Sequence, residues 1–198
     1  MTELVTDGDR RILATGSLRL AFHWAGDRWA HSLEGRRPDD STWLLARTIE
    51  GDPARDDPAR VVSPAYQQLE FQADGPRWLA LLVGQSGPHH FSAVFAVEEA
   101  SDRSRISIDV ADRCRKPVEA LACTYQVEAP VEDIAAADPG SMAWDVGGAR
   151  LTLAAEPPAL VGTAEGGRLG TMAQALAGLS TDGPTRRCVY SWSWTAST

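Results

Sequence analysis

The chain has 198 residues, of which 43% are hydrophobic, and it carries a formal net charge of −8 with a pI near 5.0. This length and apolar content predict one domain over residues 1–198 with a substantial hydrophobic core. An acidic chain repels phosphate backbones and anionic lipid surfaces, and no apolar run approaches the length of a membrane span. We therefore expect neither a nucleic-acid partner nor a membrane partner.

Cysteine usage and the first residues bear on the cellular compartment. Cys114, Cys123 and Cys188 are widely spaced and form no C-x-x-C motif, which favours free thiols in a reducing compartment. Residues 1–11 are acidic and polar and lack the apolar segment of a signal peptide. We therefore expect a cytoplasmic protein, and the Ala-, Arg- and Asp-rich composition is typical of a high-GC bacterial source.

The clearest strand pattern lies in LRLAFHWAGDRWAHSLE, residues 18–34. Apolar and polar residues alternate on both sides of Gly26-Asp27, which predicts a β-hairpin in which Trp24 faces Trp29. His31 falls on the apolar face of this hairpin. We predict that it is a buried, hydrogen-bonded core histidine rather than a catalytic one.

The next segment, residues 35–60, is rich in Pro, Asp and Arg around a short apolar stretch at Trp43–Ile49. This composition predicts a loop, one short strand and a second loop. The charge run at 50–60 indicates a solvated loop, and a ligand-gating lid is the alternative. Two further strands are expected within residues 65–85, around a turn at Ala73–Pro76.

The segments HHFSAVFAVEE and RISIDVADR, joined by ASDR, predict another pair of antiparallel strands. A four-residue loop at 100–103 puts every bulky apolar side chain on one face, because residues two apart in a strand point the same way. The expected cross-strand pairs on that face are Val97 with Ile106, Phe95 with Ile108, and Ala93 with Val110.

Period-two patterns continue to the C-terminus. EALACTYQV (119–127) alternates, MAWDVGGARLTL (142–153) predicts a Gly-Gly hairpin, and CVYSWSW (188–194) gathers its cysteine and aromatic residues on one face. The one helix-like piece is LGTMAQALAGL (169–179), whose apolar residues keep helical spacing. About ten strands in antiparallel hairpins predict an all-β fold, an antiparallel β-sandwich with at most one or two short helices.

Two adjacent histidines, His89 and His90, follow a Gly-Pro turn in LVGQSGPHHFSAVFAVEE (82–99). Consecutive residues of a strand point to opposite faces, so the two rings cannot share one metal ion unless a bulge intervenes. The run holds no further ligand at useful spacing, and we expect no metal site. The register predicts that His89 joins the apolar face and His90 the polar face.

The polar face around His90 is the candidate site. The same register sets His90 beside Arg113, and it puts Asp109, Ser92 and Glu98 on that face. Because a histidine transfers a proton near neutral pH and a carboxylate takes or holds one, His90 and Asp109 are the candidate catalytic residues. Arg113, Ser92 and Glu98 are the candidate substrate-binding residues for a small polar ligand such as a sugar. The alternative is an ordinary solvent-facing sheet surface with cross-strand salt pairs.

The N-terminal hairpin, the paired strands around YQQLEFQADGPRWLALLVG and the histidine-bearing strand GPHHFSAVF follow an order that resembles the galactose mutarotase-like (aldose 1-epimerase) β-supersandwich group. The resemblance implies interconversion of sugar anomers by acid–base catalysis, without metal or cofactor. It implies a histidine as general acid on the ring oxygen, matched by His90 or alternatively by His89. It also implies a C-terminal glutamate as base, and the glutamates after residue 150 are Glu156 and Glu165. The alternative function is a non-catalytic β-sandwich that binds a carbohydrate or another small polar molecule, since fold alone does not choose between them.

Overall fold

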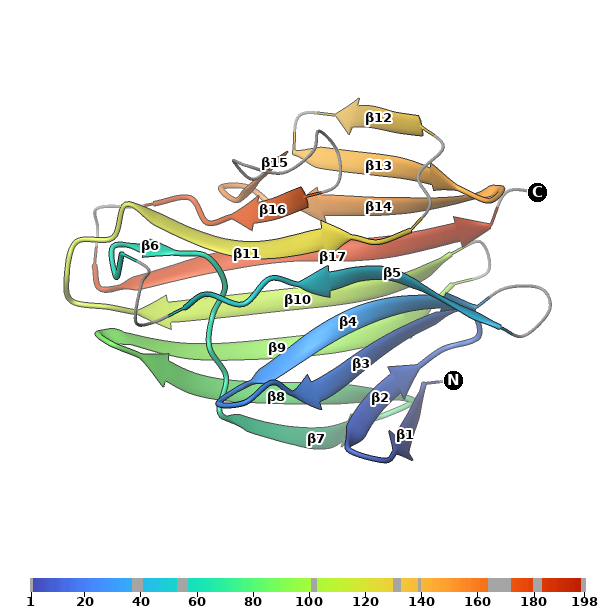
Figure 1. The fold of residues 1–198 in the computed structure, drawn as a ribbon, viewed down its shortest axis with the longest axis horizontal. Helices are drawn as coiled ribbons and strands as arrows, with labels where there is room; N and C mark the ends of the chain where they lie inside the picture. The colour runs from blue at the N-terminus through green and yellow to red at the C-terminus, as the bar shows by residue number, and fades with distance from the viewer. Residues whose placement is uncertain are drawn as a thin grey trace.

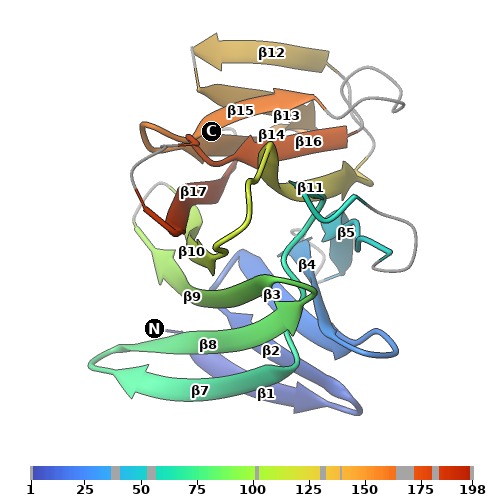
Figure 2. The ribbon, with the colours of Figure 1, turned by 90° about the vertical axis from the view of Figure 1, so that its left-hand side faces the viewer.

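The computed structural model of the protein describes residues 2–36, 41–52, 57–100, 103–129, 133–138, 140–163, 172–179 and 183–196. In these residues the chain forms β-strands, and the strands are arranged in two sheets packed against each other (Figures 1 and 2). The all-β sandwich predicted from the alternating pattern is confirmed. No helix within these ranges is long and apolar enough to cross a membrane.

The first sheet contains nine strands of the described chain. Eight of them lie in the spatial order β1 (Glu3–Asp7), β2 (Arg10–Ala14), β3 (Leu18–Trp24), β4 (Trp29–Arg36), β5 (Thr42–Thr48), β11 (Ala120–Val127), β16 (Met172–Leu176) and β15 (Leu160–Thr163). Along this path each strand is antiparallel to its neighbour. The ninth strand, β6 (Arg60–Val61), pairs in parallel with β11.

The second sheet contains eight strands of the described chain, each antiparallel to its neighbours. Their spatial order is β12 (Asp133–Asp138), β13 (Ser141–Val146), β14 (Ala149–Ala155), β17 (Thr185–Ala196), β10 (Ser104–Arg113), β9 (His89–Glu99), β8 (Arg77–Ser86) and β7 (Gln68–Asp74). The two sheets therefore hold more strands than the sequence predicted. One reason is that β1 is mostly exposed, so no apolar alternation marks it.

The registers predicted for the main hairpins are confirmed. Trp24 lies opposite Trp29, Phe95 opposite Ile108, and Trp144 opposite Leu151. One expectation about burial fails, because 46% of Trp24 is exposed although it lies on the predicted apolar face. Trp24 ends β3 and Trp29 begins β4, and the two rings pack edge to face with centroids 5.6 Å apart, with Trp29 against the margin of the core.

The helical spacing of residues 169–179 gives a wrong prediction. Met172–Leu176 form β16, which is hydrogen-bonded to β11 on one side and to β15 on the other. Residues 169–171 lie outside the described ranges. The alanines of β16 are buried while the residues between them are partly exposed, so the same stretch also satisfies a period of two. Pairing with two neighbouring strands outweighs the helix propensity of an alanine-rich segment.

One hydrophobic cluster fills the space between the sheets and draws residues from both of them. Phe22 of β3 meets Phe95 of β9, with ring centroids 5.6 Å apart and the rings edge to face. Trp144 and Trp192 stack at 5.7 Å, and both are fully buried. The alternating aromatic and aliphatic residues that predicted the strands thus form the core between the two layers.

Residues 57–67, here called the crossing segment, contain β6 and lead from it to the second sheet; the teal trace from β6 to β7 in Figures 1 and 2 is its second part. The Tyr66 carbonyl accepts a hydrogen bond from the Trp29 N–H (2.7 Å), and the Gln67 N–H donates to the Val83 carbonyl (3.0 Å). A Cβ atom at Gly84 would lie 2.0 Å from a backbone oxygen of the segment, so only glycine lets the chain cross β8 this closely.

Candidate functional site

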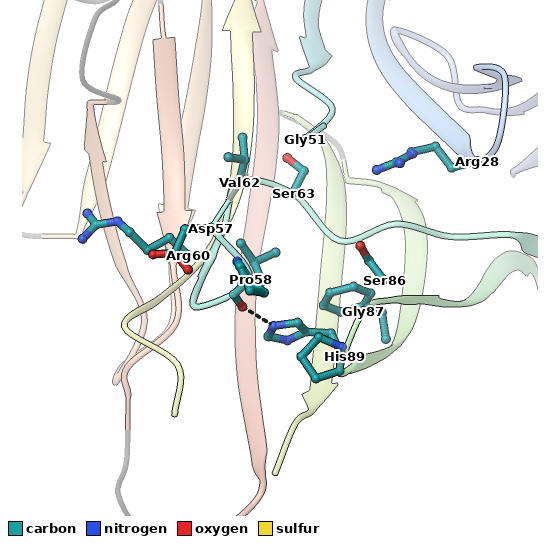
Figure 3. A pocket seen from close by; sticks show the side chains of 13 residues that line it. Arg28, Gly51, Asp57, Pro58, Arg60, Val62, Ser63, Ser86, Gly87 and His89 are labelled. Atoms are coloured by element: carbon teal, nitrogen blue, oxygen red, sulfur yellow. Dashed lines mark hydrogen bonds between the residues drawn. The ribbon is translucent and has the colours of Figure 1, made fainter. Parts of the chain in front are cut away.

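A cavity of about 300 Å³ lies at one end of the sandwich, between the crossing segment and the turn that joins β8 to β9 (Figure 3). Arg28 reaches toward it from the turn between β3 and β4, Asp57 and Ser63 from the crossing segment, and Ser86 and His89 from the β8–β9 hairpin. A volume of about 300 Å³ is at the lower end of the range for small-molecule sites. The wall combines hydrogen-bonding groups with apolar surface, as such sites do.

His89 on the wall of this cavity is held at both ring nitrogens. Nδ1 lies 2.9 Å from Oδ2 of Asp112, and Nε2 lies 2.6 Å from the carbonyl oxygen of Pro58, the contact drawn as a dashed line in Figure 3. A carboxylate and a backbone carbonyl both accept hydrogen bonds, so both contacts are satisfied when each ring nitrogen carries a proton. The exposed fraction of the side chain is 2% for His89 and 0% for Asp112.

The alternation of β9 and β10 explains why this pair is inside the protein. His89 is the first residue of β9 and shares the inner face with Phe91, whose ring is parallel to the imidazole at 5.5 Å. Asp112 lies directly opposite Phe91 in the ladder, so its carboxylate meets the ring of His89 diagonally across the strand pair. Its second oxygen, Oδ1, is buried with no hydrogen-bond partner among the described residues.

The predicted register around His90 is confirmed, and His90 points to the outer face of the second sheet. His90 lies opposite Arg113, and both side chains are exposed. Asp109 lies on the same face but four residues farther along β10, roughly 13 Å away, and Arg187 binds its carboxylate with two hydrogen bonds. Ser92 lies between these two levels of the ladder. The outer face therefore brings His90 and Arg113 together and keeps Asp109 apart from them.

Glu98, the remaining predicted binding residue, lies at the far end of the same face. It lies opposite Arg105, and its carboxylate forms an ion pair with Arg77 of β8. The resemblance implied a C-terminal glutamate as the base. Oε1 of Glu156 lies 3.7 Å from Nη2 of Arg105, and Glu165 falls outside the described residues. Neither Glu98 nor Glu156 lines the cavity beside His89.

His31 is a buried, hydrogen-bonded core histidine, as predicted. Its Nε2 lies 2.8 Å from the hydroxyl of Tyr125, which in turn lies 2.7 Å from the hydroxyl of Tyr190. Burial lowers the pKa of His31 to about 3, because the charged ring would be out of contact with water. The ring is therefore neutral near neutral pH and links the two sheets through the tyrosine hydroxyls.

This lowered pKa predicts a pH dependence of stability. Between the ordinary histidine pKa of 6.5 and about 3, the unfolded chain binds a proton at His31 and the native protein does not, so acid favours unfolding. The free energy of unfolding should fall by about 1.4 kcal/mol per pH unit from this residue within that window. Denaturant titrations from pH 7 to pH 4 should show a shallower decrease for His31→Gln than for the wild type. His90→Gln, a change at an exposed ring, should keep the wild-type slope, and parallel slopes for all three proteins would contradict the prediction.

The cavity beside His89 contains residues that the sequence analysis did not single out. Arg28 is nearly buried, and the hydrogen bonds that its guanidinium donates to the Asp27 carboxylate raise its pKa. Ser63 holds its place by accepting a hydrogen bond from the Thr124 N–H (3.0 Å). No periodic signal marks either residue, because both lie in connecting segments. Asp112 did carry a signal, since it is the one charged residue on the apolar side of β10.

His89 and His90 lie on opposite faces of β9, so they do not share a ligand. Within the described ranges, no three His, Cys, Asp or Glu side chains are grouped so that they could hold a metal ion. No protein-family model matches the chain, and no curated protein matches its sequence. The geometry of the site is therefore the basis for a functional proposal.

Proposed function

We propose that the protein binds a monosaccharide, or a polar molecule of similar size, in the cavity beside His89 and interconverts its anomers by proton transfer. The observation that carries the proposal is the buried His89–Asp112 pair on the wall of a cavity of about 300 Å³. A histidine oriented by a carboxylate at Nδ1 presents Nε2 as an acid or a base. His89 is also the second of the two positions that the mutarotase resemblance suggests for the general acid.

The chemistry follows from the hydrogen bonds of His89. A ligand oxygen that replaces the Pro58 carbonyl at Nε2 would receive the proton that now points to that carbonyl. Opening a sugar ring requires a proton on the ring oxygen and loss of a proton from the anomeric hydroxyl. Asp57 lines the same cavity, and one of its carboxylate oxygens accepts from the Ala59 N–H, so the other oxygen is the acceptor we assign to the hydroxyl proton. Ring closure returns both protons, so the protein is unchanged after each turnover.

The rest of the wall suits a sugar. The Arg28 guanidinium and the hydroxyls of Ser63 and Ser86 offer hydrogen bonds to hydroxyl groups, while Phe91 gives the apolar surface on which sugar C–H groups pack. We further propose a bacterial cytoplasmic location, which the three cysteines support because each is buried and none forms a disulfide.

The test is a panel of monosaccharides measured by thermal shift and by NMR exchange between anomers, with three matched variants. We expect one or more sugars to stabilise the wild type and to exchange anomers faster in its presence. His89→Gln and Asp112→Asn should abolish the exchange, and each variant is first shown to be folded by circular dichroism. His90→Gln, which changes the adjacent residue on the outer face, should retain both binding and exchange.

The other outcomes decide between the alternatives. Loss of binding in His90→Gln but not in His89→Gln would overturn the cavity assignment in favour of the outer face with Arg113, Ser92 and Asp109. Sugar binding without anomer exchange would overturn the catalytic part and leave a carbohydrate-binding sandwich. A wild type that no sugar stabilises would overturn both parts.

A further inference from the structure

A second depression, of about 550 Å³, lies on the outer face of the second sheet and is lined by Pro88, His90, Arg113, Arg115 and Lys116. Pro88 also lines the cavity beside His89, so the β8–β9 turn separates the two. The cavity lies on the core side of the turn and the depression on the solvent side. We call this depression the basic depression.

The charge of the basic depression is opposite to that of the whole chain. The chain carries a net charge of −8, yet the depression holds Arg113, Arg115 and Lys116, the single lysine of the sequence. Among the residues that the structure describes, no carboxylate lies within salt-bridge distance of these three cations. Among the side chains that the structure describes, none therefore compensates these three positive charges.

The sheet itself keeps carboxylates away from this end of its outer face. The ladder row through the depression reads Gln85, His90, Arg113 and Thr185 across β8, β9, β10 and β17. Every member of this row is a neutral polar residue, a histidine or a cation. The nearest carboxylate along the outer side of β10 is Asp109, which Arg187 already neutralises through two hydrogen bonds.

We propose that the basic depression binds the phosphate group of a small phosphorylated molecule. Guanidinium groups match the geometry of phosphate oxygens and bind them with paired hydrogen bonds, and an ammonium group adds a third positive charge. Gln85 and Thr185, the neighbours of His90 and Arg113 in the ladder row, are neutral and add no negative charge that would repel a phosphate group. The inference does not rest on the proposed sugar chemistry, because it uses none of the residues that carry it.

A small phosphate compound fits better than nucleic acid. The three cationic residues of the basic depression lie together at one end of the second sheet, while the chain as a whole is strongly acidic. A polyanion extending beyond the depression would meet the repulsive field of that chain, whereas a single phosphate or diphosphate group would not.

Titration calorimetry at about 0.15 M salt with pyrophosphate and with inorganic phosphate tests the proposal. We expect saturable binding, tighter for pyrophosphate, and a loss of about tenfold or more in affinity in the double variant Arg113→Gln/Arg115→Gln. The matched control is Arg103→Gln, which removes a positive charge just before β10 begins, at the opposite end of that strand. This variant should bind as the wild type does.

Lys116 gives an independent readout, because it is the single lysine. An amine-reactive reagent should label Lys116 and the N-terminal amine, and mass spectrometry separates the two. Pyrophosphate should slow labelling at Lys116 several-fold and leave labelling of the N-terminus unchanged.

Three results would overturn the proposal. The first is equal pyrophosphate affinity in the wild type and the double variant, and the second is labelling of Lys116 that pyrophosphate does not slow. The third is tighter binding of a short DNA duplex or of phosphatidylserine vesicles than of pyrophosphate, which would assign the depression to a macromolecular or lipid phosphate instead.

Discussion

Replacing His89 by leucine is expected to lower the free energy of unfolding by about 3–5 kcal/mol, because it leaves the buried carboxyl group of Asp112 without its hydrogen-bond partner. Asp112 is fully buried, and His89 Nδ1 at 2.9 Å is the partner that the structure gives to its Oδ2. The substitution also removes the hydrogen bond to the Pro58 carbonyl (2.6 Å), one of the contacts that hold the crossing segment against β9.

Urea unfolding followed by tryptophan fluorescence measures this effect. The double variant His89→Leu/Asp112→Leu should recover much of the loss, since two apolar residues of suitable size often replace a buried ion pair at little cost. His90→Leu, at the exposed neighbouring position, should change stability by less than about 0.5 kcal/mol. A His89→Leu protein as stable as the wild type would mean that the contact between His89 and Asp112 does not stabilise the fold, and it would remove the basis of the proposed proton transfer.

Replacing Phe95 by alanine is expected to cost about 3–5 kcal/mol of stability, since truncating a buried aromatic residue loses its burial energy and leaves a cavity. Phe95 is completely buried on β9 and contacts rings that belong to the first sheet and the crossing segment. Its ring centroid lies 5.6 Å from Phe22, 4.8 Å from His31 and 6.5 Å from Tyr66. These contacts join the two layers of the sandwich at its centre.

The neighbouring residue supplies the control for this prediction. Val94 precedes Phe95 on the same strand but is 40% exposed on the outer face, so Val94→Ala should cost less than about 1 kcal/mol. Denaturant unfolding of both variants under identical conditions gives the comparison. Similar losses for the two variants would contradict the assignment of Phe95 to the inner face, and with it the register that places His89 inside and His90 outside.

The alternation of residues along the strands was sufficient to predict the sandwich and several registers. The pairs of Phe95 with Ile108, of Trp24 with Trp29 and of His90 with Arg113 all follow from period-two patterns and short loops. Such predictions succeed because a shift of one residue would turn an entire apolar face toward water. Where a strand lacks that contrast, as in β1, or is rich in alanine, as in β16, the sequence pattern was absent or misleading.

The candidate site was only partly accessible from the sequence. The register placed His89 and His90 on opposite faces, and it also placed Asp112 on the apolar side of β10, where a charged residue is costly unless it has a partner. The residue pattern nevertheless favoured the outer face as the site, because His90 and Asp109 are polar residues that share that face. The separation of those two residues along β10 already follows from the predicted register, whereas the ion pair of Arg187 with Asp109 depends on the position of β17 beside β10.

Residue alternation is enough to predict on which face of a strand a side chain lies, because its direction depends on its immediate neighbours and on the burial of one face. What those side chains contact depends on the packing of the whole fold. The crossing segment brings the Pro58 carbonyl to His89 from 31 residues away, and Arg28 reaches the same cavity from a different sheet. Contacts of this kind depend on how two sheets and a connecting loop pack in space, and no local pattern of apolar and polar residues encodes them.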